Sequence, residues 1–225
     1  MKKIALFDFC QTLCDFETAD PFVDYVKEHV DPTKRMLVIS YLLSFFNRTG
    51  LNIFFDVIGH IFHYSINKKL LLLELKGIDK QKIDDLALGY YKSKIKPHLI
   101  PEMISILKTE KNRGSEIAIV SASYYPFLQL FCADFDVDYL VTNEFLYSKD
   151  NVFEGKICEK DCIYKNKVSR LRTVLRDKSY IVVSSYGDSK SDSPILSIAE
   201  QGFVISHKYH KPWVEKTSFK EIIWK

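Results

Sequence analysis

Acidic residues stand where two of the predicted strands end. Asp8 follows the short apolar run 4–7, and Asp188 lies near the end of the run 179–189, four residues before Asp192. A carboxylate held at the end of a strand can attack phosphorus as a nucleophile. Several carboxylates together can hold Mg²⁺, which prefers carboxylate, water and phosphate oxygens. The residue types therefore indicate phosphoryl transfer.

A serine and a lysine complete this set. Ser121 stands near the end of the buried run 115–123, where its hydroxyl would donate to a phosphate oxygen. Lys165 and Lys167 lie on the helix predicted before the strand 179–189, and either ammonium group would neutralise the charge that develops during transfer. Ligands of parallel sheets bind beyond the carboxyl ends of the strands, so we expect these side chains at one edge.

Strands and helices alternate after Pro97, with a short hairpin strand predicted at 152–158. The predicted helices cover 100–114, 125–135, 165–177 and 193–201, and the other strands cover 115–123, 137–143, 179–189 and 202–207. The run 202–207 is expected to be the last strand. This alternation is typical of a parallel sheet with right-handed crossovers. The predicted fold class is α/β, with a Rossmann-like core of three layers.

The segment between the first two strands is predicted to be helical throughout. Its apolar residues recur at helical spacing or form short apolar runs, which predicts helices over 17–30, 36–46, 51–66, 67–77 and 80–95. We therefore expect an all-helical cap, residues 15–94, inserted into a core formed by residues 1–14 and 95–225. The aromatic residues of the cap are expected to be mainly core.

Composition excludes several classes of protein. The 225 residues carry a net charge of +3 without a long run of lysine and arginine, so no nucleic-acid partner is expected. The apolar runs 36–46 and 51–66 are shorter than the ~20 residues that span a bilayer, so no transmembrane segment is predicted. Their apolar surface leaves two alternatives, which are packing within the cap and contact with a lipid or membrane face.

The five cysteines are widely spread and contain no Cys-x-x-Cys pair. A disulfide framework is therefore not expected, and a reducing cytoplasm is the predicted location. Cys10 and Cys14 share their spacing with Cys158 and Cys162, which leaves a zinc site as a minor alternative.

Four short motifs together resemble the haloacid dehalogenase superfamily, and the resemblance covers nearly the whole chain. They are "DFCQT" at 8–12, "VSAS" around Ser121, "NKVSRL" with Lys167, and "GDSKSD" at 187–192. The helical insertion and the hairpin before Lys167 are similar to the phosphoserine-phosphatase-like branch. The apolar cap also resembles members that act on phospholipids, so the expected substrate is a small phosphorylated compound, with a lipid phosphate as one possibility.

The resemblance implies a role for each residue of the site. Asp8 would attack the phosphoryl group, and water would hydrolyse the aspartyl-phosphate. Mg²⁺ would be held by Asp8, Asp188 and the backbone carbonyl of Cys10. Thr12, Ser121 and Ala122 would bind the phosphate. Lys167, with Lys165 as its rival, would stabilise Asp8 and the transferring group, while Asp192 would orient the lysine or a water.

Cys10 departs from the family pattern, which has an acid–base aspartate at this position, and Gln11 replaces the usual glycine. The backbone carbonyl is unaffected by this change, but the carboxyl group that would serve as general acid and base is lost. General acid–base groups typically raise a reaction rate by about 10²–10⁴-fold. We expect a weakened or narrowed phosphatase that favours acyl or aryl phosphates, whose leaving groups need little protonation.

Other roles stay open at this stage. A non-catalytic member would keep the phosphate pocket for binding or regulation. A phosphonate-cleaving member would need a cap lysine. The candidates are Lys27, Lys34, Lys68 and Lys69, and the sequence favours none of them over the others. A dehalogenase needs no metal, which the retained Asp188 and Asp192 argue against. His60 and His63, three residues apart, are a minor metal-site alternative.

Overall fold

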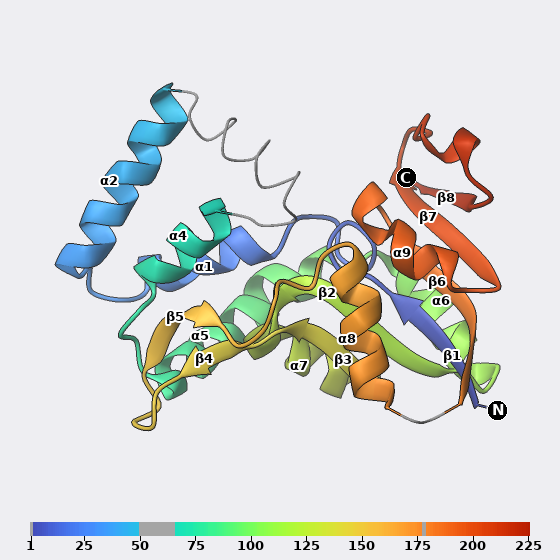
Figure 1. Ribbon diagram of the computed structural model, residues 1–225, viewed down its shortest axis with the longest axis horizontal. Helices are drawn as coiled ribbons and strands as arrows, with labels where there is room; N and C mark the ends of the chain where they lie inside the picture. Colours follow the sequence, from blue (N-terminus) through green and yellow to red (C-terminus); the bar gives the residue numbers. More distant parts are fainter. Residues whose placement is uncertain (1, 50–65, 177–178) are drawn as a thin grey trace.

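The computed structural model describes residues 2–49, 66–176 and 179–225. Its centre is a six-stranded sheet in the order β3-β2-β1-β6-β7-β8, with every neighbouring pair parallel (Figure 1). The strands are β1 (Lys2–Phe7), β2 (Glu116–Tyr124), β3 (Tyr139–Asn143), β6 (Tyr180–Gly187), β7 (Gln201–His207) and β8 (Lys220–Trp224). Because β1 lies between β2 and β6, the carboxyl ends of these three strands are adjacent.

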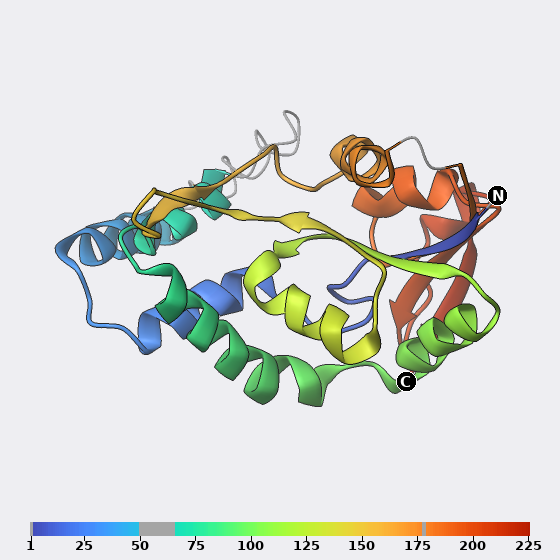
Figure 2. The ribbon, with the colours of Figure 1, turned by 90° about the horizontal axis from the view of Figure 1, so that it is seen from below.

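Strand β1 points alternate side chains into two apolar layers, as the period of a strand requires. Ala5 and Phe7 join the layer under α6 (Pro101–Asn112) and α7 (Tyr125–Phe135). Ile4 and Leu6 join the layer under α8 (Lys165–Leu175) and α9 (Ser193–Ser197). Figure 2 shows the two pairs of helices on opposite faces of the sheet. The predicted three-layer α/β class is confirmed.

The predicted core elements agree with the structure within a few residues, with two exceptions. The run 202–207 is not the last strand, because β8 follows it and pairs with β7 at the sheet edge. The hairpin strand β5 (Phe153–Ile157) pairs with β4 (Phe145–Tyr147), a strand that was not predicted. Both missed strands are short, and polar or charged residues interrupt the sequence around them.

All regular elements described between β1 and α6 are helical, as predicted. They are α1 (Ala19–Glu28), α2 (Lys34–Thr49), α4 (Ile66–Glu74), α5 (Lys80–Tyr90), a π-helical turn (Tyr91–Ile95) and a 3₁₀ turn (Lys96–His98). The predicted helix 51–66, with His60 and His63, lies almost entirely outside the described residues. Phe45, expected in the core, is 48% exposed. No helix in the described part of the chain combines the length and apolar character needed to cross a membrane.

The chain passes between the sheet and the helical segment at two places that lie side by side. The amide of Asp15 donates to the carbonyl of His98 (3.0 Å), and the amide of Ile100 donates to the carbonyl of Leu13 (2.9 Å). The β4–β5 hairpin also reaches the helical segment, because the amide of Gly77 donates to the carbonyl of Phe153 (2.9 Å). The predicted cap boundaries, residues 15 and 94, stay a prediction. The β4–β5 hairpin lies outside these boundaries in the sequence but packs against the helical segment.

Candidate active site

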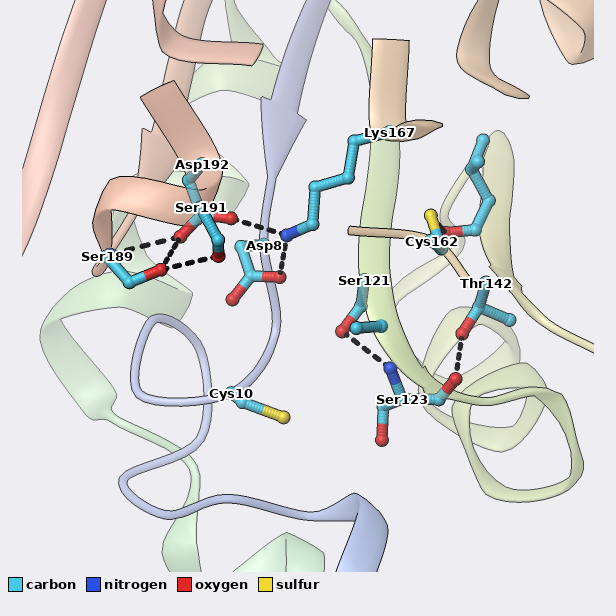
Figure 3. Close-up of polar contacts among 12 residues, drawn as sticks. Asp8, Cys10, Ser121, Ser123, Thr142, Cys162, Lys167, Ser189, Ser191 and Asp192 are labelled. Carbon is cyan, nitrogen blue, oxygen red and sulfur yellow. Dashed lines mark hydrogen bonds and ion pairs between the residues drawn. The ribbon is translucent and has the colours of Figure 1, made fainter. Parts of the chain in front are cut away.

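Asp8 is held at the carboxyl edge of the sheet by backbone and side-chain bonds. Its amide donates to the carbonyl of Tyr186 on β6 (2.8 Å), which continues the parallel ladder by one residue. Its buried carboxylate accepts from the Lys167 ammonium group at 2.7 Å, and that nitrogen also donates to Asp192 at 2.5 Å (Figure 3). Lys165 is exposed two residues earlier on α8, so the structure brings only Lys167 of the two candidates to Asp8.

A tight turn after β6 fixes Asp192. Its second carboxylate oxygen accepts from the backbone amide of Ser189 (3.0 Å) and from the Ser189 hydroxyl (2.9 Å), forming a capping box at the 3₁₀ turn Lys190–Asp192. Gly187 permits this approach, because a Cβ there would lie 2.6 Å from the Asp192 Cβ. The two carboxylate oxygens of Asp192 are therefore bonded to Lys167 and to Ser189 of its own turn.

Three carboxylates converge beside Lys167. Asp8, Asp188 and Asp192 each offer an oxygen within 4.8 Å of those of the other two. Asp188 also accepts a bond from the Lys211 ammonium group at 3.4 Å, and the backbone carbonyl of Ile205 holds that nitrogen at 3.0 Å. An all-oxygen set of this kind suits a hard divalent cation such as Mg²⁺.

Burial and mutual repulsion govern the charges of this cluster. Burial raises the pKa of Asp8, and Asp192 and Asp188 add to the rise while the Lys167 ammonium group opposes it. Burial, with repulsion from Asp192, raises the pKa of Asp188 to about 6. The two carboxylates bonded to Lys167 outweigh its burial and raise the pKa of that lysine, which keeps it charged. A divalent cation at this edge would relieve the repulsion among the carboxylates that Lys167 and Lys211 leave uncompensated.

The Cys10 side chain lies on the turn that follows Asp8 (Figure 3), and its thiol belongs to a chain of buried hydroxyl groups. Its sulfur is 3.0 Å from the Thr18 hydroxyl, which lies 2.6 Å from the Ser123 hydroxyl on β2. Burial raises the pKa of Cys10 well above 9.0, and the nearby Glu17 and Asp8 carboxyls add to this effect. Cys10 is therefore a neutral thiol. Gln11 has a φ of 51°, in the left-handed region that favours glycine.

A cavity of about 200 Å³ opens over this cluster. Ser121 and Ala122 line it, as do the catalytic candidates, whereas Thr12 is fully buried and does not. The Thr12 hydroxyl has no hydrogen-bond partner among the described residues, and the phosphate contact proposed for it stays a prediction. The Ala122 carbonyl accepts a hydrogen bond from the Asn143 side-chain amide at 2.7 Å.

Four further side chains, Glu17, Ala19, Asp20 and Lys68, line the cavity opposite the sheet. The sequence gives no site role to the first three, and it makes Lys68 a candidate only for phosphonate cleavage. The Lys68 ammonium group donates to the Ala122 carbonyl (2.6 Å) and to Asp161 (2.9 Å), so α4 is bonded to the end of β2. Glu17 was recognisable only as a carboxyl near the start of the first cap helix. Among the four cap lysines considered from sequence, Lys68 is the one that lines this cavity.

The five cysteines are all free. Cys10 is buried where it lines the cavity, Cys14 is buried in the core, and Cys162 is buried under α8, while Cys132 is half-buried and Cys158 is exposed. The described residues that converge as a potential metal site are carboxylates and include no cysteine, so the zinc alternative gains no support from the geometry.

Comparisons with known proteins agree with this geometry. The protein CicA of Caulobacter vibrioides is 26% identical over 127 residues, which cover 56% of this chain and 57% of CicA. A Bordetella pertussis protein of unknown function has a similar structure, with a TM-score of 0.76, 16% identity and coverage of 99% of this chain and 98% of that one. Phosphoserine phosphatase in its apo form gives a TM-score of 0.63, 16% identity and coverage of 99% and 94%.

The sequence profile of one family matches residues 5–197, a span that includes the end of β1, Asp8, the helical insertion, Lys167 and the turn with Asp192. This span covers most of the chain and all the residues that converge at the sheet edge. The protein therefore belongs to the haloacid dehalogenase-like hydrolase family.

Proposed function

We propose that the protein is a Mg²⁺-dependent phosphohydrolase that acts on a small phosphorylated substrate through a phosphoryl group carried on Asp8. The observation that carries the proposal is the buried contact of Lys167 with Asp8 and Asp192, beside Asp188 and under one cavity. Buried charges are costly unless they are paired, so an arrangement with more carboxylates than cations favours a functional role.

The described cavity lining contains five carboxyl and two ammonium groups. A phosphate dianion would be repelled by this excess, and bound Mg²⁺, held by Asp8, Asp188 and the carbonyl of Cys10, would offset it and polarise the phosphoryl oxygens. Asp8 attacks phosphorus and the bond to the leaving oxygen breaks. Water then attacks the aspartyl-phosphate, which releases phosphate and restores the carboxylate. Lys167 orients Asp8 and stabilises charge in both steps.

Cys10 limits the leaving groups that this site can expel. The thiol is protonated and its pKa is raised, so it is a weak proton donor to the leaving oxygen in the first step. When the leaving group departs without that proton, Cys10 stays a thiol and offers no thiolate to activate water in the second step. We infer a narrowed phosphatase that prefers acyl and aryl phosphates. The proposed cap, residues 15–94, would select the substrate through Glu17, Asp20 and Lys68, and the free thiols favour a reducing compartment such as the cytoplasm.

A second candidate function is phosphate-ligand binding without turnover, which the neutral Cys10 thiol favours. A panel of aryl, acyl, alkyl and lipid phosphates, assayed for phosphate release with Mg²⁺, separates the two. The phosphatase proposal expects release from aryl and acyl phosphates, and a faster rate on alkyl phosphates in Cys10→Asp. If the wild type is inactive on every ester while Cys10→Asp is active, the binding function holds. Equal wild-type rates on alkyl and aryl phosphates would contradict the inferred preference.

A further inference from the structure

One face of α2 exposes large apolar side chains as a continuous stripe. Leu37, Val38, Tyr41 and Leu42 are 59%, 60%, 74% and 40% exposed. Elsewhere in the described chain, exposed large apolar side chains such as Val174 and Tyr209 are scattered over different elements, which is normal for a protein surface. Figure 1 shows α2 at the outer edge of the molecule, away from the central sheet.

The opposite face of α2 is already attached to the rest of the protein. Met36 is buried, and the Ser40 hydroxyl donates to the Glu74 carboxylate of α4. The Arg35 side chain donates to the carbonyl of Lys76 at 3.1 Å. The helix therefore has a fixed orientation, with its inner face anchored and its apolar stripe turned outward.

Positive charges lie at both ends of the stripe. Lys34 and Arg48 are each seven residues from Tyr41, so both belong to the same face of the helix as the tyrosine. Both cations are exposed, and the sixteen residues of α2 include no acidic side chain. An apolar stripe that contains a tyrosine and ends in cations is typical of a helix that lies in the interface of an anionic bilayer.

We propose that the outward face of α2, formed by Leu37, Val38, Tyr41 and Leu42 between Lys34 and Arg48, docks on a membrane surface that contains anionic lipid. A second copy of this chain fits the face less well. Two such helices would place cations against each other in either orientation, and neither helix offers a carboxylate to pair with them. A bilayer with anionic headgroups satisfies both the apolar side chains and the cations.

Sedimentation of the full chain with lipid vesicles tests the proposal. The wild type should bind vesicles of phosphatidylcholine with phosphatidylglycerol more strongly than vesicles of phosphatidylcholine alone, and added salt should weaken this binding. The double substitution Leu37→Ser with Tyr41→Ser should lower binding at least tenfold. Removing each cation, as Lys34→Gln or Arg48→Gln, should lower binding to the anionic vesicles by about fivefold.

The matched control replaces exposed apolar residues elsewhere, as Val174→Ser with Tyr209→Ser, and should bind like the wild type. Thermal melting of each variant confirms that these surface substitutions leave the protein folded. Wild type that binds neither vesicle, or α2 variants that bind as well as the control, would overturn the proposal. A dimer in light scattering that dissociates on Tyr41→Ser would assign the face to a second copy and would also overturn it.

Discussion

The ammonium nitrogen of Lys167 lies 2.7 Å from the Asp8 carboxylate, although 159 positions separate the two residues in the sequence. Both side chains are almost completely buried, and the same nitrogen binds Asp192. One cation therefore holds the proposed nucleophile and the proposed orienting carboxylate in a fixed relation at the edge of the sheet.

Lys167→Met should both destabilise the protein and reduce phosphate release. The substitution leaves two buried carboxylates without their cation, which costs about 3–5 kcal/mol. It also removes charge stabilisation, and we expect a rate lower by about 10²–10³-fold. The matched control is Lys165→Met on the exposed part of the same helix, which should change neither the melting temperature nor the rate appreciably. If the two variants lost activity equally, the role given to Lys167 would be wrong.

The Cys10 thiol should resist alkylation in the folded protein. It is buried and its pKa is raised well above 9.0, so it offers almost no thiolate to iodoacetamide at pH 8. Cys158 is exposed and should react first. Peptide mass spectrometry after timed alkylation measures both, with urea-unfolded protein as the reference in which Cys10 reacts freely. Labelling of folded Cys10 at the rate of Cys158 would contradict a neutral, shielded thiol.

Thr18 should matter for stability through its hydroxyl. This group lies between the Cys10 thiol and the Ser123 hydroxyl in a fully buried position. Thr18→Val would leave both neighbours without this partner, at a cost of about 1–3 kcal/mol in the free energy of unfolding. Urea denaturation measures the loss, and Thr173→Val on the exposed face of α8 is the control, with an expected change below about 0.5 kcal/mol. Equal midpoints for the two variants would argue against a buried polar chain.

Asp188 should make the metal-free protein less stable as pH rises. Its pKa is raised from 3.8 to about 6 in the folded state, so the folded protein binds more protons than the unfolded chain between these values. The free energy of unfolding therefore falls as pH increases through this window, by on the order of 1–3 kcal/mol.

Asp188→Asn keeps a neutral side chain and should lack this component. Melting temperatures in EDTA at pH 4.5 and pH 7 measure the effect. The melting temperature of the variant should rise relative to that of the wild type between pH 4.5 and pH 7. At pH 7, Mg²⁺ should raise the melting temperature of the wild type more than that of the variant. The same pH dependence in both proteins would show that Asp188 does not carry this titration.

The strand-end residues of the site could be predicted from sequence because local patterns define them. Asp8 and Asp188 follow apolar runs, and parallel strands bring their ends together. The choice between Lys165 and Lys167 could not be made in this way, since both lie on one helix and only its packing shows which of them faces the sheet. The sequence order of the motifs, through their family resemblance, favoured Lys167.

The opposite wall of the cavity could not be predicted, because it depends on contacts between distant segments. Lys68 reaches the cavity through bonds to Ala122 and Asp161, which are 54 and 93 positions away. Likewise, β8 was missed because five residues of mixed polarity form a strand only when β7 provides an edge to pair with. Local periodicity carries no information about either arrangement.

The most direct test of the proposed mechanism is phosphate release from an aryl phosphate with Mg²⁺, measured for the wild type and for Asp8→Asn after thermal melting has shown that both proteins are folded. We expect measurable turnover by the wild type and a rate at the uncatalysed background for Asp8→Asn, because the amide cannot form the aspartyl-phosphate. Turnover that persists in Asp8→Asn would show that Asp8 is not the nucleophile of a phosphohydrolase.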